Sequence, residues 1–321
     1  MALVEAIVAL LTQTAVFLAP KPWENWSLFS EQIARGVAIG SAYALVALAI
    51  VLVFRSSELL NFAQGEWGMF TTFVAWSLVV AGTAIGVSYV AAIALGAALA
   101  AVMFWGLVMR VRETLPLTRV AVTIAMFLMF NSAAVWIYAR GQLPKYFPSP
   151  FGLQAVDLGP FTLSRHELGT LSVSLAVMLL LSWFFTRTKV GLAMRAAATN
   201  PEASRLMGIN VNRMLTLGWA MGGALGSAAA FLIAPVTGLF TAFMFPVLIY
   251  AFAGAVLGGI ISPPGAVVGG ILIGVGENLL GTYSPSWLGS EMKLPLILMT
   301  IMAVLVVRPM GIFGQPGGGR A

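Results

Sequence analysis

The chain has 321 residues, of which 60% are hydrophobic and only 9% are charged, and its mean hydropathy is +0.96. This composition lies far outside the range of a soluble domain and predicts a protein that crosses a membrane many times. The sequence holds no cysteine and a single histidine, His166, which excludes a thiolate metal site and a catalytic thiol and argues against a metal centre. The net charge of +6 is spread over short loops, so it does not form the clustered basic face that binds nucleic acid.

Apolar segments, separated by polar or proline-containing breaks, are long enough to cross the roughly 30 Å hydrocarbon core of a bilayer as helices. They fall near residues 2–20, 33–54, 59–80, 84–109, 120–139, 168–186, 213–234, 243–261, 265–281 and 294–308. We therefore expect an all-α polytopic membrane protein with about ten transmembrane helices and short loops. The first segment lacks a basic start and an A-x-A cleavage site, which favours a retained helix over a signal peptide.

Lys and Arg residues predict the orientation, because cytoplasmic loops carry an excess of them. Placing the segment from Arg187 to Arg213 inside leaves six cations outside, namely Lys21, Arg35, Arg140, Lys145, Arg165 and Lys293. The other cations are then cytoplasmic: Arg55, Arg110, Arg112, Arg119, Arg187, Lys189, Arg195, Arg205, Arg213, Arg308 and Arg320. With ten spans, both termini are expected in the cytoplasm.

A polar island interrupts the apolar run LLNFAQGEWGMF at residues 59–70, where Asn61, Gln64 and Glu66 stand within six residues. In a regular helix Asn61 and Gln64 share a face with Gly68, whereas Glu66 points nearly opposite. Lipid tolerates polar groups on neither face. Both faces are therefore expected to meet protein or a water-filled cavity, or the helix is expected to break near Gly65.

A second island, Glu277 and Asn278, interrupts the run GVGENLLG. Two interpretations stay open for both islands. Their polar side chains line the path of a substrate, or they hydrogen-bond neighbouring helices and hold the fold together. Asn131 is a weaker candidate and is expected to join helices.

The inner segment between two apolar runs contains a short helix with its own start and stop signals. Asn200 is a typical N-cap, Pro201 suits the first helical position, and Glu202 places an acid in the first turn. Gly208 is typical of the residue that follows a helix. We expect an amphipathic helix on the cytoplasmic side that another protein can bind.

Two further patterns concern packing and loops. The outer loop at residues 140–167 is rich in proline and suits a docking or capping loop, with a mere connector as the alternative. Glycines recur at four-residue spacing, which lets helix backbones approach closely in lipid. They are Gly36 and Gly40, Gly218, Gly222 and Gly226, Gly254 and Gly258, and Gly270 and Gly274.

Four stretches, in this order, resemble the membrane permease subunits of branched-chain amino acid ABC importers. They are GVAIGSAYALVALAIVLVFRSSELLNFAQGE, VGLAMRAAATNPEASRLMGINVNR, AVLGGIISPPGAVVGGILIGVGENLLG and RPMGIFG. The resemblance implies a permease domain at residues 31–315, preceded by an extension at residues 1–30 with an extra transmembrane helix. Residues 316–321 would form a cytoplasmic tail. Gln64 stands where the family usually has His, and residues 260–265 replace a more usual glycine-containing turn, which leaves the solute open.

The predicted inner helix also resembles a motif of ABC importers. Glu202-Ala203-Ser204 followed by Gly208 is similar to the EAA-x-x-x-G coupling motif of ABC importers, with Ser204 in place of the second Ala. The resemblance implies that this helix contacts an ATPase. The expected contact residues are Asn200, Glu202, Ala203, Arg205, Leu206, Met207 and Gly208.

The resemblance implies a non-catalytic translocation subunit of an ATP-driven importer in the bacterial cytoplasmic (inner) membrane. Its solute would be a branched-chain amino acid or a related small organic acid or amide. The implied partners are cytoplasmic ABC ATPase subunits, a second permease subunit that is homologous or identical, and an extracytoplasmic solute-binding protein. The chain has no G-x-x-x-x-G-K-[ST] phosphate loop, so we expect no cofactor here and ATP with Mg²⁺ on the partners.

The sequence alone leaves open two alternatives from other functional classes. An ion-coupled secondary transporter would need no ATPase and would use Glu66 and Glu277 as proton or Na⁺ sites. An assembly or anchoring subunit would conduct nothing. The capped inner helix favours the importer, because a secondary transporter has no need of a cytoplasmic docking helix.

Overall fold

The computed structural model describes residues 25–111, 114–139, 144–159, 161–284 and 292–314, and most of these residues are helical. The first helices are α2 (Trp26–Ser57), α3 (Gln64–Val80), α4 (Ile85–Met103), α5 (Met109–Val111) and α6 (Pro116–Tyr138), with a π-helical turn, η2 (Phe104–Val108), between α4 and α5. They are followed by α7 (Arg165–Arg187), α8 (Lys189–Thr199), α9 (Pro201–Leu206), α10 (Val211–Thr237), α11 (Met244–Gly258), α12 (Pro263–Tyr283) and α13 (Lys293–Val307). Two short antiparallel strands, β1 (Ala155–Asp157) and β2 (Thr162–Ser164), pair with Val156 opposite Leu163.

Every apolar segment predicted from residue 33 onward contains a helix. Within the described residues, six helical stretches are long and apolar enough to cross a membrane: α2, Ile85–Val111, α6, α7, α10 and α12. The helix α3 has 17 residues, and α11 and α13 have 15 each. The multi-span helical class is therefore confirmed, whereas the count of about ten is not, and the expected segment 2–20 lies outside the described residues.

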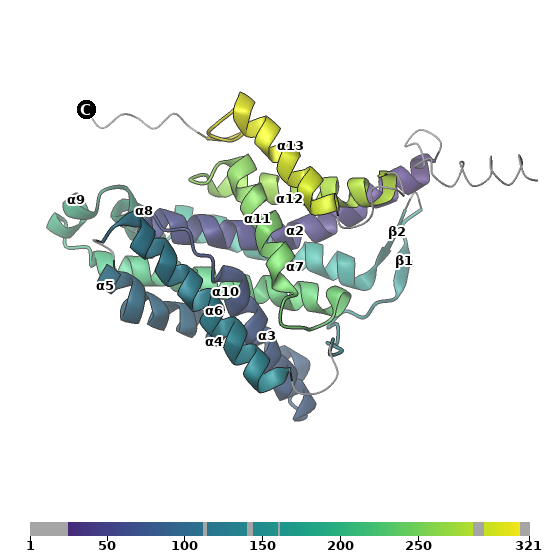
Figure 1. Ribbon diagram of the computed structural model, residues 1–321, viewed down its shortest axis with the longest axis horizontal. Coiled ribbons are helices and arrows are strands. Elements are labelled where there is room, and N and C mark those ends of the chain that lie inside the picture. Colours follow the sequence, from purple (N-terminus) through teal and green to yellow (C-terminus); the bar gives the residue numbers. More distant parts are fainter. Residues whose placement is uncertain (1–24, 112–113, 140–143, 160, 285–291, 315–321) are drawn as a thin grey trace, which may run out of the picture.

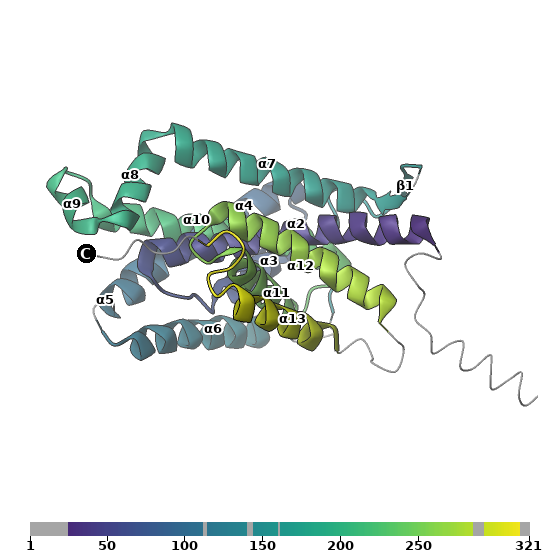
Figure 2. The ribbon, with the colours of Figure 1, turned by 90° about the horizontal axis from the view of Figure 1, so that it is seen from above.

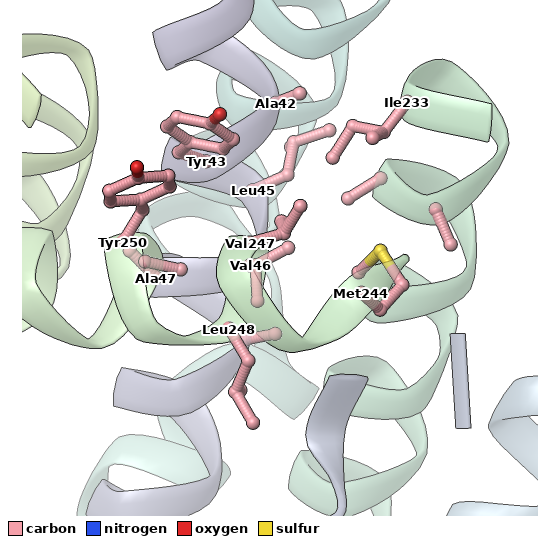
Figure 3. Packing of buried hydrophobic residues seen from close by; sticks show 14 of the residues in the cluster. Ala42, Tyr43, Leu45, Val46, Ala47, Ile233, Met244, Val247, Leu248 and Tyr250 are labelled. Carbon is pink, nitrogen blue, oxygen red and sulfur yellow. The ribbon is translucent and has the colours of Figure 1, made fainter. Parts of the chain in front are cut away.

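The helix α2 runs through the centre of the molecule, and α12, α10, α11 and α7 all pack on it (Figures 1 and 2). Its stretch from Ala38 to Val53 is almost wholly buried, as expected for a helix that is apolar on all sides. Figure 3 shows side chains of α2, α10 and α11 meeting in this core, including Leu45, Ile233 and Val247. Because α2 is buried by protein on every side, it positions the surrounding helices.

Glycines set the distance between α2 and α12, as the four-residue spacing predicts. A Cβ atom on Gly270 would lie 2.5 Å from the Cα of Ala44, and one on Gly40 would lie 2.8 Å from the Cα of Ile271. Real side chains do not approach a backbone so closely, so only glycine allows these two helices to touch. The packing role predicted for this stripe is confirmed.

The connections differ from the prediction in two places. The inner segment holds a second helix, α8, ahead of the predicted one, because Thr188 caps it by accepting a hydrogen bond from the backbone N–H of Gly191 at 3.0 Å. The outer loop contains the hairpin β1–β2, and α7 begins at Arg165, where Ser164 and Glu167 form a capping box. Both features depend on short local hydrogen bonds inside polar segments.

The outer loop is fixed on the helix ends, so its capping role is favoured over that of a connector. The buried ring of Phe147 stacks on Phe231 of α10 and on Tyr89 of α4, whose hydroxyl donates to the carbonyl of Pro148 at 3.1 Å. The loop and hairpin lie at one end of the molecule, and α5, α8 and α9 lie at the other (Figures 1 and 2). This arrangement agrees with the predicted orientation, which stays a prediction.

Candidate functional site

The first polar island lies where the chain passes from α2 to α3. The helix α2 ends at Ser57, and residues 58–63 connect it to α3 without helical structure. Asn61 is 1% exposed, and its Oδ1 atom accepts a hydrogen bond from the backbone N–H of Ala63 at 3.1 Å, which closes a turn. The helix thus breaks just before Gly65, as the second of the two alternatives expected, so the face that Asn61 would share with Gln64 in a regular helix does not form.

Gln64 ties the start of α3 to α10. It is fully buried, and its Nε2 atom donates to the carbonyl oxygen of Gly222 at 2.7 Å. Its Oε1 atom accepts from Nδ2 of Asn61 at 3.3 Å, so the first two island residues meet despite the break. A Cβ atom on Gly226 would collide with the same Gln64 amide, and the glycine stripe of α10 therefore makes room for this polar contact.

Glu66 ties α3 to α6. The side chain is 1% exposed, and its Oε2 atom accepts a hydrogen bond from Nδ2 of Asn131 at 3.1 Å. The same Asn131 nitrogen donates to the carbonyl oxygen of Thr241, just before α11, at 2.8 Å. Asn131 joins segments as predicted, and Glu66 sits in the first turn of α3, where the helix dipole favours an acid.

The second island ties α12 to α2. The Oε2 atom of Glu277 accepts from the Tyr43 hydroxyl at 2.6 Å, and Nδ2 of Asn278 donates to the carbonyl oxygen of Gln32 at 3.1 Å. Tyr43 lies beside Tyr250 of α11, with ring centroids 5.4 Å apart (Figure 3). Glu277 and Asn278 are half-buried, and within the described residues no hydrogen bond connects them to the first island.

Several contacts at this site were not predicted from the sequence. The Thr71 hydroxyl donates to Ser227 of α10 at 2.9 Å, and the Thr123 hydroxyl of α6 reaches the carbonyl oxygen of Leu60 at 3.2 Å. Their only signal was a hydroxyl within an apolar run, which does not identify a partner. Together with the two islands, they show that many polar groups of the helix interiors find partners inside the protein, as lipid favours. Among the described residues, Trp67 Nε1 and Ser174 Oγ are buried without a hydrogen-bond partner.

The predicted inner helix is present as α9, with both predicted end signals. The Oδ1 atom of Asn200 accepts from the backbone N–H of Ala203 at 3.0 Å. Gly208 has a φ of +78°, and its N–H donates to the carbonyl of Arg205 while that of Ile209 donates to Ser204, both at 3.0 Å. These paired bonds form a Schellman motif, which satisfies the last carbonyls of the helix.

The outward face of α9 carries two large apolar side chains. Leu206 is 90% exposed and Met207 is 82% exposed, whereas Ser204 is buried against the rest of the protein. The remaining predicted contact residues, Asn200, Glu202, Ala203, Arg205 and Gly208, are also exposed. The helix projects beyond α8 at one end of the molecule (Figures 1 and 2), as a surface for a partner would.

A bundle of apolar helices joined by buried polar contacts, with a capped helix projecting at one end, defines a multi-pass membrane protein. A family model described as "Branched-chain amino acid transport system / permease component" matches residues 32–307. The chain therefore belongs to this family of ABC importer permeases.

Two relatives support this membership along nearly the whole chain. The chain is 30% identical to "High-affinity branched-chain amino acid transport system permease protein LivH" of Salmonella typhimurium, over 91% of this chain and 98% of that protein. It is 29% identical to the corresponding protein BraD of Pseudomonas aeruginosa, over 90% and 96% of the two chains. Among solved structures, "PsaBC from Streptococcus pneumoniae in complex with Fab" matches with a TM-score of 0.49 and 15% identity, over 88% and 92% of the two chains.

Family membership decides between the classes that the sequence left open. The chain is a non-catalytic translocation subunit of the cytoplasmic membrane, and ATP is used by partner ATPase subunits. Membership in this family also implies a binding protein as a further partner. The ion-coupled alternative, with Glu66 and Glu277 as ion sites, is not supported.

Proposed function

We propose that this chain moves a branched-chain amino acid, or a related small organic acid or amide, inward across the membrane. The names of the relatives in Salmonella and Pseudomonas, which are branched-chain amino acid permeases, support the solute class. A permease needs few strong contacts with its solute, because tight binding midway would slow release. We infer that the binding protein supplies most of the affinity, and that the chain itself binds no cofactor.

We further propose a second permease subunit and ten membrane crossings in this chain. The resemblance to paired permeases supports the second subunit. The ten crossings would comprise the six long helical stretches, the shorter helices α3, α11 and α13, and the extension at residues 1–30. Helices of 15 to 17 residues reach about 22 to 26 Å, which suits a crossing that is partly surrounded by protein.

The role of the two polar islands stays a prediction. Their hydrogen bonds to neighbouring helices favour the interpretation that they hold the helices together. A role in the substrate path for Asn61, Gln64, Glu66, Glu277 and Asn278 would require these bonds to open during transport. Variants of Asn131 and Glu66, considered in the Discussion, separate the two roles.

We propose that α9 is the coupling helix that seats in a groove of the ATPase. The observation that carries this proposal is a helix closed by hydrogen bonds at both ends that leaves Leu206 and Met207 exposed. Such side chains suit helix-in-groove binding, and Arg205 supplies a charge that can pair across the interface. The partial EAA-x-x-x-G match at Glu202 to Gly208 supports the same role.

The test is a double variant, Arg205→Glu with Gly208→Val, in the reconstituted importer. Gly208 has no neighbour within 4 Å of an added Cβ, so valine acts only through its unfavourable positive φ, at about 1–2 kcal/mol. We expect weaker co-purification of the ATPase and a loss of the ATP hydrolysis that the loaded binding protein stimulates.

A matched control is available for the backbone strain. Gly82 has a φ of +91° and also has no neighbour within 4 Å, but it lies between α3 and α4, away from α9. Gly82→Val should leave stimulated hydrolysis intact. If the double variant keeps both the stable complex and full stimulation, α9 is not the coupling element.

A further inference from the structure

A cleft of about 520 Å³ opens between α2, α7, α8, α10 and α12, near the end of the molecule that carries α9. Its inner wall is apolar and includes Leu48, Leu52, Met178 and Leu181. Leu48 and Arg55 lie about 10 Å apart along α2 at 1.5 Å per residue, so the cleft runs from the helix end well into the span. We call it the arginine cleft, after the two residues at its mouth.

Those residues are Arg55, in the last turn of α2, and Arg195, on α8. Both residues line the cleft, Arg55 being partly buried and Arg195 exposed. Within the described part of the chain neither forms an ion pair, and none of the described lining residues is acidic. Two cations that line one apolar cleft, with no acid among the described lining residues, favour an anionic occupant.

We propose that an anionic phospholipid of the inner leaflet occupies the arginine cleft, with its phosphate between Arg55 and Arg195 and an acyl chain along the apolar wall. Guanidinium groups match phosphate oxygens in geometry and charge, and basic pockets between membrane helices suit anionic headgroups. An amino acid zwitterion fits less well, because the described lining offers no acid to its ammonium group. The phosphate of such a lipid would neutralise the two Arg residues, and its acyl chain would cover the apolar wall.

A lipid in the arginine cleft would also affect coupling. Arg195 belongs to α8, which passes through Asn200 directly into α9. A phosphate shared by Arg195 and Arg55 would fix α8 against α2 and so fix the direction in which α9 projects. Stimulated ATP hydrolysis should therefore depend on anionic lipid, even though that lipid touches no part of α9.

The first test uses the wild-type importer after removal of native lipid. Phosphatidylglycerol and phosphatidylcholine with the same acyl chains are added in turn, and bound lipid is counted by native mass spectrometry. We expect one phosphatidylglycerol retained per chain, a raised thermal midpoint, and little retention of phosphatidylcholine. Equal retention of both lipids would overturn the proposal, and this comparison needs no variant.

The second test uses the double variant Arg55→Gln with Arg195→Gln. Its affinity for phosphatidylglycerol should fall about thirtyfold, from the contribution that two basic residues make near an anionic surface. The control is Arg187→Gln, an exposed cation at the end of α7 that does not line the cleft. Val268→Trp, which fills the apolar wall and keeps both charges, should also displace the lipid.

Other occupants give different results. If the cleft receives a helix of a second permease subunit, the double variant weakens subunit association and leaves the lipid count unchanged, which overturns the proposal. Unchanged lipid binding in both the double variant and Val268→Trp would also overturn the proposal. Neither lipid test measures ATP hydrolysis or solute transport. Their outcome is therefore independent of the test of α9.

Discussion

Replacing Asn131 by Ala should loosen the attachment of α3 to its neighbours, because one amide nitrogen of Asn131 serves both Glu66 and Thr241. A hydrogen bond contributes about 0.5–1.5 kcal/mol net, and a buried acceptor left without its donor costs about 1–3 kcal/mol. With Glu66 as the buried acceptor left without its donor and the bond to Thr241 as the further bond lost, these effects predict a loss of about 1.5–4.5 kcal/mol in the free energy of unfolding. Glu66→Gln keeps an acceptor oxygen for Asn131 and should cost about 1 kcal/mol.

The assay is thermal unfolding of the purified permease in detergent, with the level of each variant in the membrane measured alongside. Ser132→Ala is the matched control, since Ser132 is the next residue of α6 and is exposed. If Asn131→Ala unfolds at the same temperature as Ser132→Ala, the hydrogen bonds of Asn131 do not hold these helices together.

Transport by Glu66→Gln decides the role of the island. If Glu66 only joins helices, the variant should reach normal membrane levels and transport at a rate close to that of the wild type. Normal levels and normal stability with abolished transport would refute this reasoning and place Glu66 in the substrate path.

Two further predictions concern helix packing and the outer loop. Gly270→Ala should destabilise the protein by about 1–3 kcal/mol, because α12 must move away from Ala44. Gly276→Ala on the same helix is the control and should be neutral, because an added Cβ there has no neighbour within 4 Å. Equal thermal midpoints of the two variants would contradict the prediction. His166 bridges Ser149 at 2.9 Å and the carbonyl of Leu232 at 2.8 Å, so His166→Ala should expose residues 144–159 to added protease far more than Ser149→Ala does. An identical cleavage rate in both variants and the wild type would show that the bridge does not fix the loop.

Features with local causes could be predicted from the sequence. The apolar runs gave the positions of the helices, because burial in lipid demands length and apolarity along a continuous stretch. The ends of α9 followed from Asn200 and Gly208, because a cap acts on residues within one turn. The close packing at the glycines of α2 and α12 followed from their spacing, although the pairing of these two helices with each other did not.

Features with distant causes could not be predicted. The sequence offered a helix break near Gly65 only as one alternative, because the position of the break at residues 58–63 depends on a turn closed by Asn61 and on the Thr123 hydroxyl that reaches Leu60 from another helix. Glu277 meets Tyr43, which is 234 residues away in the chain, and no local pattern identifies that partner. The polar islands were visible as exceptions to an apolar rule, but only the three-dimensional arrangement supplies their partners.

The most direct test of the proposed function is uptake of labelled leucine, isoleucine and valine by vesicles that contain this chain, its permease and ATPase partners, and the binding protein. Uptake should require ATP on the ATPase side and should persist when ionophores collapse the proton and Na⁺ gradients. Uptake of any of the three amino acids that is driven by an ion gradient without ATP would contradict an ATP-driven importer, and no uptake of any of them would contradict the proposed solute.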